Sequence, residues 1–166
     1  MTDEMTNDSP TTRGSRRSGA AVMTQEKSPL IASRTTRLLL TVITAAGLGV
    51  DAYVHWHLAP NFDTLIGAGS PHLSQGTLFR LEAVLALVAM ILVLVTRHRL
   101  AAAFAFLVAA GGLGALLLYG YVDVGGFGPL PDMYDPIWYA EKTLSAVAEA
   151  VAAAGALALF ILPRRR

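Results

Sequence analysis

Four long apolar runs alternate with short polar segments in this chain of 166 residues. The runs cover residues 38–58, 78–95, 100–122 and 143–162. A helix rises about 1.5 Å per residue, so about 20 apolar residues cross the hydrocarbon core of a bilayer. The pattern predicts an all-α integral membrane protein with four transmembrane helices, joined by outer loops at 59–77 and 123–142.

Residues 1–36 are a separate polar region, rich in Ser, Thr and Arg and without apolar periodicity. Such a segment cannot bury a core, so we expect a disordered basic tail before a membrane domain at 37–166. Translation from Met23 instead of Met1 would remove nothing that is expected to fold. Val50-Asp-Ala52 resembles a signal-peptidase site, but the apolar pattern continues to Leu58, which favours a retained first span over a cleaved one.

The basic residues predict the orientation in the membrane. All but Arg80 and Lys142 of the 13 Lys and Arg residues lie in the tail or directly after it at Arg37, in the turn at 97–99 or at the C-terminus. Because Lys and Arg accumulate in cytoplasmic segments, we expect cytoplasmic N- and C-termini and two outer loops. The Ala-, Gly- and Arg-rich composition is typical of a bacterial protein, here one of the plasma membrane.

Short turns between successive spans predict a compact antiparallel four-helix bundle. Helices in lipid approach each other through small residues. The fourth span offers small residues at a spacing of four, and the third offers two glycines. We expect these positions to form helix contacts: Ala146, Ala150, Ala154, Ala158, Gly111 and Gly114.

The composition narrows the classes of function. Apolar residues make up 54% of the chain and charged residues only 15%, against about 25% in soluble domains. The absence of cysteine excludes a disulfide framework, a CxxC redox pair and a thiolate metal site. No phosphate-binding glycine motif, serine elbow or HExxH helix occurs, so the sequence leans away from an enzyme and indicates no catalytic residue.

Acidic residues inside the apolar runs are the first candidates for a site, because a charge in the bilayer is costly. Asp51, Glu82 and Glu149 fall in one layer, roughly 6–10 Å below the outer boundary. Asp51 and His55 are four apart and share a helix face. With Arg80 as counter-charge and Tyr119 within reach, the predicted polar pocket contains Asp51, His55, Arg80, Glu82, Tyr119 and Glu149. The alternative is an internal ion-pair layer that only fixes the register of the helices.

The histidines are candidate metal ligands. His55, His57 and the loop residue His72, together with Asp51, are ligand types that suit zinc or copper. On a helix, however, positions two apart diverge by about 200°. Histidines that are solvated or anchored at the interface are therefore the alternative. No cofactor is predicted, and a metal ion or a quinone remains open.

The segment 119–142 concentrates aromatic residues on one side of the membrane. A plain aromatic belt would appear at both interfaces, but all five Tyr and both Trp fall near the outer boundary. Gly125, Gly126 and Gly128 are suited to the turns of an ordered loop. We expect this loop to contact a partner through Tyr134, Asp135, Trp138 and Tyr139.

The first hairpin resembles the DoxX-type four-helix membrane proteins. The resemblance rests on Gly47-Leu-Gly49, the polar patch at 51–57 and the stretch at 81–87, in which the acid Glu82 precedes a Leu-rich run. It covers about a third of the chain and does not include the loop at 123–142. It implies a bundle associated with membrane redox or quinone chemistry, with Glu82 as the one residue carried over.

These observations predict a small multi-pass membrane protein, foremost an accessory or structural subunit whose outer loop docks a partner. The alternative is a small redox, transport or metal-handling protein that uses the pocket of Asp51, His55, Glu82 and Glu149. The expected partners are the lipid bilayer and a larger membrane or extracytoplasmic protein. An oligomer is left open, and nucleic acid is not expected, because a basic tail attracts anionic lipid headgroups first.

Overall fold

The computed structural model describes residues 34–67, 73–96 and 98–163. These residues form four long helices and one short 3₁₀ helix, with two isolated bridges and no β-strand among them. The elements are α1 (Arg34–Leu58), η1 (Ala59–Phe62), α2 (Gln75–Val95), α3 (Arg99–Tyr121) and α4 (Ala140–Ile161). All four α-helices are long and apolar enough to cross a membrane, which confirms the predicted all-α architecture and number of spans.

The helices extend beyond the apolar runs at their polar ends. α1 begins at Arg34, so residues 34–36 belong to a helix and not to the predicted tail, whose remainder lies outside the described residues. The Arg37 guanidinium donates to the Leu162 carbonyl at 2.9 Å, and a cation at the C-terminal end of α4 is favourable there. The apolar pattern did not predict the first turn of α1, because the contact that stabilises it comes from the end of α4, which is distant in the sequence.

The starts of α2 and α4 also differ from the predicted boundaries. Ser74 caps α2 by accepting the Thr77 N–H at 3.0 Å, so this helix begins at Gln75, within the predicted loop at 59–77. α4 begins at Ala140, three residues before the predicted start, and shortens the loop predicted at 123–142. Polar first turns such as these lie in a helix without contributing to an apolar run.

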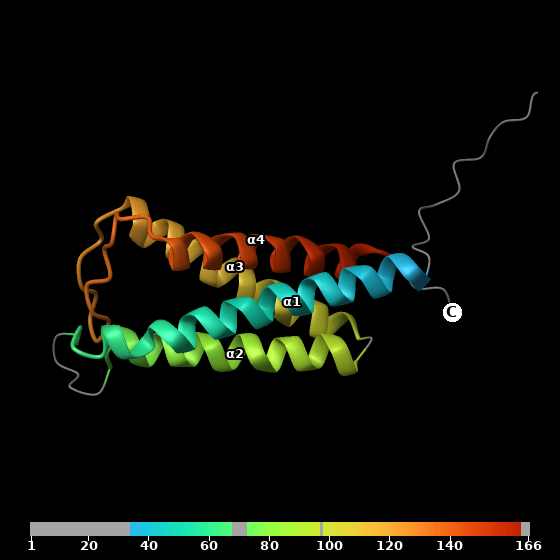
Figure 1. The fold of residues 1–166 in the computed structure, drawn as a ribbon, viewed down its shortest axis with the longest axis horizontal. Coiled ribbons are helices and arrows are strands. Elements are labelled where there is room, and N and C mark those ends of the chain that lie inside the picture. Colours follow the sequence, from blue (N-terminus) through green and yellow to red (C-terminus); the bar gives the residue numbers. More distant parts are fainter. Residues whose placement is uncertain (1–33, 68–72, 97, 164–166) are drawn as a thin grey trace, which may run out of the picture.

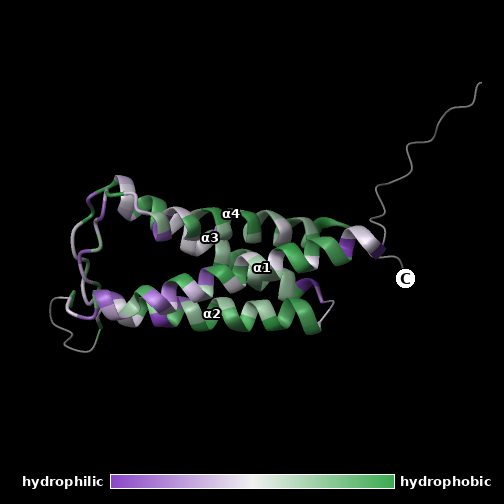
Figure 2. Ribbon diagram, viewed as in Figure 1, coloured by the Kyte–Doolittle hydropathy of each residue, from purple (hydrophilic) through white to green (hydrophobic). Residues whose placement is uncertain are grey.

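Figure 1 shows the four helices side by side, with α1 between α2 and α4 and with α3 packed against α4 and α2. The connections α1–α2 and α3–α4 lie together at one end of the bundle, called the loop end below. A carbon placed on Gly67 of the first connection would collide with the Pro129 carbonyl of the second, so the two connections are in close contact. Figure 2 shows hydrophilic residues gathered towards the loop end and apolar residues along the helices.

Small residues form the centre of the bundle, but not those predicted. Ala150 and Ala154 are exposed, and open space surrounds Gly111 and Gly114, so the predicted contact faces of the third and fourth helices are wrong. The α4 face that packs inward instead includes fully buried alanines, as do the facing helices: Ala86, Ala89, Ala105, Ala109, Ala152 and Ala156. Alanine is so frequent in α4 that spacing alone did not distinguish its faces.

The loop between α3 and α4 is ordered by its own acidic side chains. Asp123, Asp132 and Asp135 each accept the backbone N–H two residues further on, at 3.0–3.2 Å. Gly125 and Gly128 have positive φ angles of 63° and 57°, which L side chains rarely adopt. These carboxylates therefore shape turns, and glycine is required at two of the positions expected from the sequence.

Candidate functional site

Two carboxylates and an imidazole meet between α1 and α4, in the part of the bundle nearest the loop end. Asp51 of α1 and Glu149 of α4 are both fully buried. The Nδ1 atom of His55 lies 2.8 Å from Oδ1 of Asp51, one helical turn away. The Ser145 hydroxyl oxygen lies 3.3 Å from Oδ1 of Asp51 and 3.4 Å from Oε1 of Glu149. Asp51, His55, Ser145 and Glu149 are called the acid–histidine cluster below.

Glu82 of α2 adjoins this cluster across a glycine of α3. A carbon placed on Gly112 would lie 2.8 Å from Oε1 of Glu149 and 3.1 Å from Oε1 of Glu82. The two carboxylates therefore converge on Gly112, a position of α3 that lacks a side chain. The sequence analysis predicted helix contacts at Gly111 and Gly114 and did not identify Gly112. The one feature that could have indicated Gly112 is its position opposite the predicted acid layer.

Several polar atoms of this region are buried without a hydrogen-bond partner in the part of the chain that the structure describes. They are Oδ2 of Asp51, Oε1 of Glu82 and Oε2 of Glu149. The Thr44 hydroxyl oxygen is a fourth such atom, but it lies about two turns from Asp51 on α1, beside Gly155. Buried polar groups are normally paired, because an unpaired one loses its hydration without compensation. Three carboxyl groups with free oxygens thus face one imidazole, and the described residues include no Lys or Arg in an ion pair with them.

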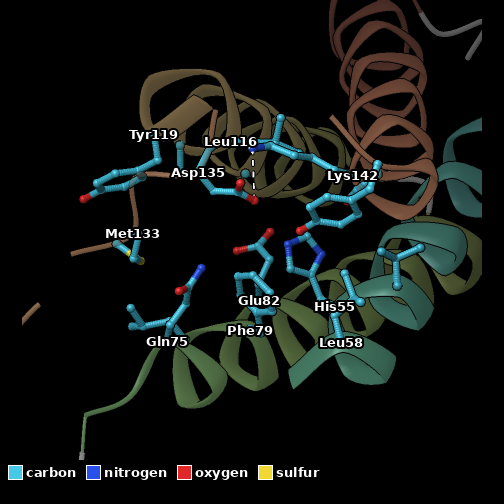
Figure 3. A pocket seen from close by; sticks show the side chains of 16 residues that line it. His55, Leu58, Gln75, Phe79, Glu82, Leu116, Tyr119, Met133, Asp135 and Lys142 are labelled. Atoms are coloured by element: carbon cyan, nitrogen blue, oxygen red, sulfur yellow. Dashed lines mark hydrogen bonds and ion pairs between the residues drawn. The ribbon is translucent and has the colours of Figure 1, made fainter. Parts of the chain in front are cut away.

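A cavity of about 210 Å³ leads from the loop end to this region. Figure 3 shows labelled side chains from all four helices and from the 122–139 loop surrounding one space, with His55 and Glu82 pointing into it. Apolar and aromatic groups dominate its wall: Val54, Leu58, Leu78, Phe79, Ala115, Leu116, Tyr119, Met133 and Tyr139. His55, Glu82 and Ser145 line the cavity, so it connects with the acid–histidine cluster.

The structure corrects the role predicted for Arg80. Its guanidinium makes two hydrogen bonds to the Asp63 carboxylate, at 2.6 and 2.8 Å, and both side chains are about two-fifths exposed. The hydrogen bond from Arg80 lowers the pKa of Asp63 below its ordinary value. Because Arg80 lies two positions before Glu82, it faces the opposite side of α2 and does not neutralise the acids.

Lys142 stabilises the loop rather than the acids. Its side chain is only 8% exposed, donates to the Asp135 carbonyl and lies 3.4 Å from the Asp135 carboxylate. The same ammonium lies 5.6 Å from the centre of the Trp138 ring, in a cation–π contact. The Asp135 N–H in turn donates to the Tyr119 carbonyl at 3.0 Å. These bonds position the loop as one wall of the cavity.

The predicted histidine site is not assembled as expected. His57 is exposed and stacks on Tyr53, with ring centroids 5.7 Å apart, so it diverges from His55. His72 lies outside the described residues. The group with ligand geometry is instead Asp51, His55 and Glu149, one ligand atom of each lying within 4.8 Å of the others.

Only two of the four residues predicted to dock a partner are exposed on the surface of the loop. Tyr134 and Trp138 are exposed, whereas Asp135 and Tyr139 line the cavity. Burial raises the pKa of the Tyr139 phenol, with the Asp135 carboxylate contributing in the same direction. Sequence reasoning missed Phe127 and Ile137, which are 78% and 68% exposed and are the most exposed apolar side chains of the loop.

The fold and the site define a class of protein: a helical multi-pass membrane protein with a buried carboxylate–imidazole cluster at one end. Comparison with protein-family models, with curated proteins and with solved structures finds no significant match. The resemblance of the first hairpin to DoxX-type proteins stays a prediction.

Proposed function

We propose that this protein is a small transport or metal-handling membrane protein that takes up a cation in the acid–histidine cluster. One observation carries the proposal: Asp51 and Glu149 are fully buried, each has an oxygen without a partner, and no described Lys or Arg pairs with them. A buried carboxylate needs a proton, a metal ion or a cationic substrate, because its charge is otherwise uncompensated in a low dielectric.

A purely structural ion-pair layer fits these contacts less well. Such a layer requires bases, and the two available ones are engaged elsewhere, Arg80 with Asp63 and Lys142 with Asp135. The acids are also linked to a cavity, which a register-fixing layer does not need. Polar groups that converge at the end of a mostly apolar cavity are typical of a ligand site.

The proposed orientation places this cavity on the extracytoplasmic side of a plasma membrane. The antiparallel bundle then has cytoplasmic termini, and the basic residues Arg34, Arg37 and Arg99 lie at the cytoplasmic end. The positive-inside tendency supports this arrangement. A cation would enter from outside, pass between the 122–139 loop and α2, and reach the cluster through the cavity.

Cation-for-proton exchange in the reconstituted protein tests this function. Full-length protein in lipid nanodiscs is mixed with Na⁺, K⁺, Mg²⁺, Ca²⁺, Mn²⁺ or Zn²⁺ in weak buffer, and proton release is followed with an indicator dye. At least one cation should release protons from the wild type, and Asp51→Asn and Glu149→Gln should each abolish the release. Glu141→Gln, on the exposed first turn of α4, is the matched control and should behave as wild type.

Two results would contradict the proposed exchange of cations for protons. If no cation releases protons, or if Glu149→Gln releases as many as wild type, the cluster is not an exchange site. Folding of each variant is checked by circular dichroism and gel filtration before the measurement.

A second function, docking of a partner by an accessory subunit, is favoured by the exposed apolar side chains of the ordered loop. Phe127, Ile137 and Trp138 project from a loop whose turns are held by internal hydrogen bonds. Aromatic anchors dominate many interfaces. Crosslinking in native membranes should then give an adduct that Phe127→Ala with Ile137→Ala removes, whereas Leu107→Ala on the apolar surface of α3 should retain it.

A further inference from the structure

The geometry points to a first-row transition-metal ion bound by Asp51, His55 and Glu149, with an open coordination position towards Glu82 and the cavity. This inference rests on the proposed function and names the cation. The three residues come from two helices and offer ligand atoms within 4.8 Å of one another. Ligands about 2.0–2.2 Å from one ion lie roughly 3–4 Å apart, so a small side-chain adjustment is enough.

The ligand types select the metal class. Imidazole suits zinc, copper, iron and nickel, whereas calcium takes six to eight oxygen ligands and magnesium keeps several waters. A set of one nitrogen and two carboxylates in which both carboxylates are fully buried therefore favours a transition metal. The two carboxylates supply the two negative charges that balance a divalent ion, and no described Lys or Arg forms an ion pair with them.

Unpartnered atoms show where the ion would lie. Ser145 occupies Oδ1 of Asp51 and Oε1 of Glu149, which leaves Oδ2 and Oε2 as the buried oxygens without a partner. The Nδ1 atom of His55 lies 2.8 Å from Oδ1 of Asp51 and 3.1 Å from the Asp51 carbonyl oxygen, so it is the ring nitrogen on the carboxylate side, and an ion shared by His55 and Asp51 would replace this contact. Both carboxylates thus retain an oxygen for coordination while the other oxygen is held in place.

An open fourth coordination position of the ion would account for the unpaired oxygen of Glu82 and for the absence of a side chain at Gly112. Glu82 has its own unpartnered oxygen, Oε1, which lies on the Gly112 side of the site together with Oε1 of Glu149. Three protein ligands and an open position are the pattern of sites that exchange a water or a substrate, in contrast to closed structural sites. Glu82 would hydrogen-bond to that water or act as a fourth ligand during passage of the ion.

Cobalt titration of the full-length protein tests the inference without any knowledge of its activity. Chelator-treated protein in nanodiscs is titrated with Co²⁺, whose visible d–d absorption reports coordination, and Zn²⁺ is then added as competitor. We expect one Co²⁺ per chain, displacement by Zn²⁺, and no displacement by a 100-fold excess of Mg²⁺ or Ca²⁺. Asp51→Asn, His55→Gln and Glu149→Gln should each weaken binding by more than about 100-fold, and Ser145→Ala by about 10- to 100-fold.

The chain offers two close controls. His57→Gln changes an exposed histidine two positions from His55, and Glu141→Gln changes an exposed acid two turns before Glu149. Both variants should bind Co²⁺ as wild type. Loss of binding in these controls, with binding retained in the cluster variants, would place the ion on the surface and overturn the inference.

Two further outcomes separate this inference from the proposed function. If Na⁺, K⁺, Mg²⁺ or Ca²⁺ releases protons through Asp51 and Glu149 while Co²⁺ and Zn²⁺ do not bind, the metal assignment fails and the exchange function stands. If no cation acts, both fail. Should a cluster variant not fold, the Cu²⁺ EPR spectrum of the wild type decides: hyperfine splitting from one imidazole nitrogen is expected, and a spectrum without nitrogen coupling excludes His55 as a ligand.

Discussion

The hydroxyl oxygen of Ser145 in α4 lies 3.3 Å from Oδ1 of Asp51 in α1, although the two residues are 94 positions apart in the chain. The same oxygen lies 3.4 Å from Oε1 of Glu149, one turn further along α4. A hydroxyl has one proton, so Ser145 donates to one carboxyl group at a time. This contact joins α1 to α4 at the level of the acid–histidine cluster.

Ser145→Ala should therefore destabilise the protein. The substitution removes the buried hydroxyl that donates to one of these two carboxyl groups at a time, and leaving such a group unpaired costs about 1–3 kcal/mol. Reversible unfolding in mixed detergent, followed by circular dichroism, would measure the loss. Thr143→Ala removes an exposed hydroxyl from the same helix and should stay within about 0.5 kcal/mol of wild type. Equal effects of the two variants would mean that the Ser145 contact adds no stability.

Gly112→Ala should impair the site, whereas Gly111→Ala should not. The new carbon at position 112 would lie 2.8 Å from a Glu149 oxygen and 3.1 Å from a Glu82 oxygen, so at least one carboxylate must move. Open space surrounds position 111, where alanine should be neutral or stabilise the helix by up to about 1 kcal/mol. Cobalt affinity and unfolding of both variants check this. An unchanged affinity in Gly112→Ala would argue that the two carboxylates are not held together.

Gly47→Ala should separate α1 from α4. An added carbon would lie 2.7 Å from the Ala148 carbonyl oxygen and 3.0 Å from the Ala152 side chain, and backbone atoms cannot easily give way. Overpacking of this kind costs about 1–3 kcal/mol. Gly114→Ala, which meets nothing within 4 Å, is the control. Unfolding free energies of the pair provide the measurement, and equal values would contradict a tight contact at Gly47.

The number of helices and the position of the acid layer could be predicted from the sequence, because both follow from local properties. Runs of about 20 apolar residues define spans irrespective of their partners. Asp51, Glu82 and Glu149 fell at one depth because helical rise converts sequence position into depth. The pairing of Asp51 with His55 followed from their separation of four residues, which places them on one helix face.

The partner of Arg80 and the inward face of α4 could not be predicted, because both depend on how each helix is rotated about its axis. Arg80 and Glu82 lie at nearly the same depth, yet one faces Asp63 and the other the cluster. The inward face of α4 carries Ala152 and Ala156 instead of Ala150 and Ala154, a difference that a uniformly small-residue sequence does not encode by spacing. The 3₁₀ turn at η1 and the early start of α2 bring Asp63 to Arg80, and neither has an apolar signature.

The Asp63–Arg80 pair predicts a defined dependence of stability on pH. The hydrogen bond from Arg80 lowers the pKa of Asp63 in the folded protein, so folding favours the ionised carboxylate. The stabilisation from the pair is then fully present above the unfolded pKa of about 3.9 and is lost as the pH falls through the lower folded pKa. The melting temperature of Asp63→Asn should lie slightly below that of wild type from pH 7 to pH 5, and the difference should shrink below about pH 4. High salt should reduce it at every pH, because both side chains are exposed. A difference that grows as the pH falls would contradict the pairing of Asp63 with Arg80.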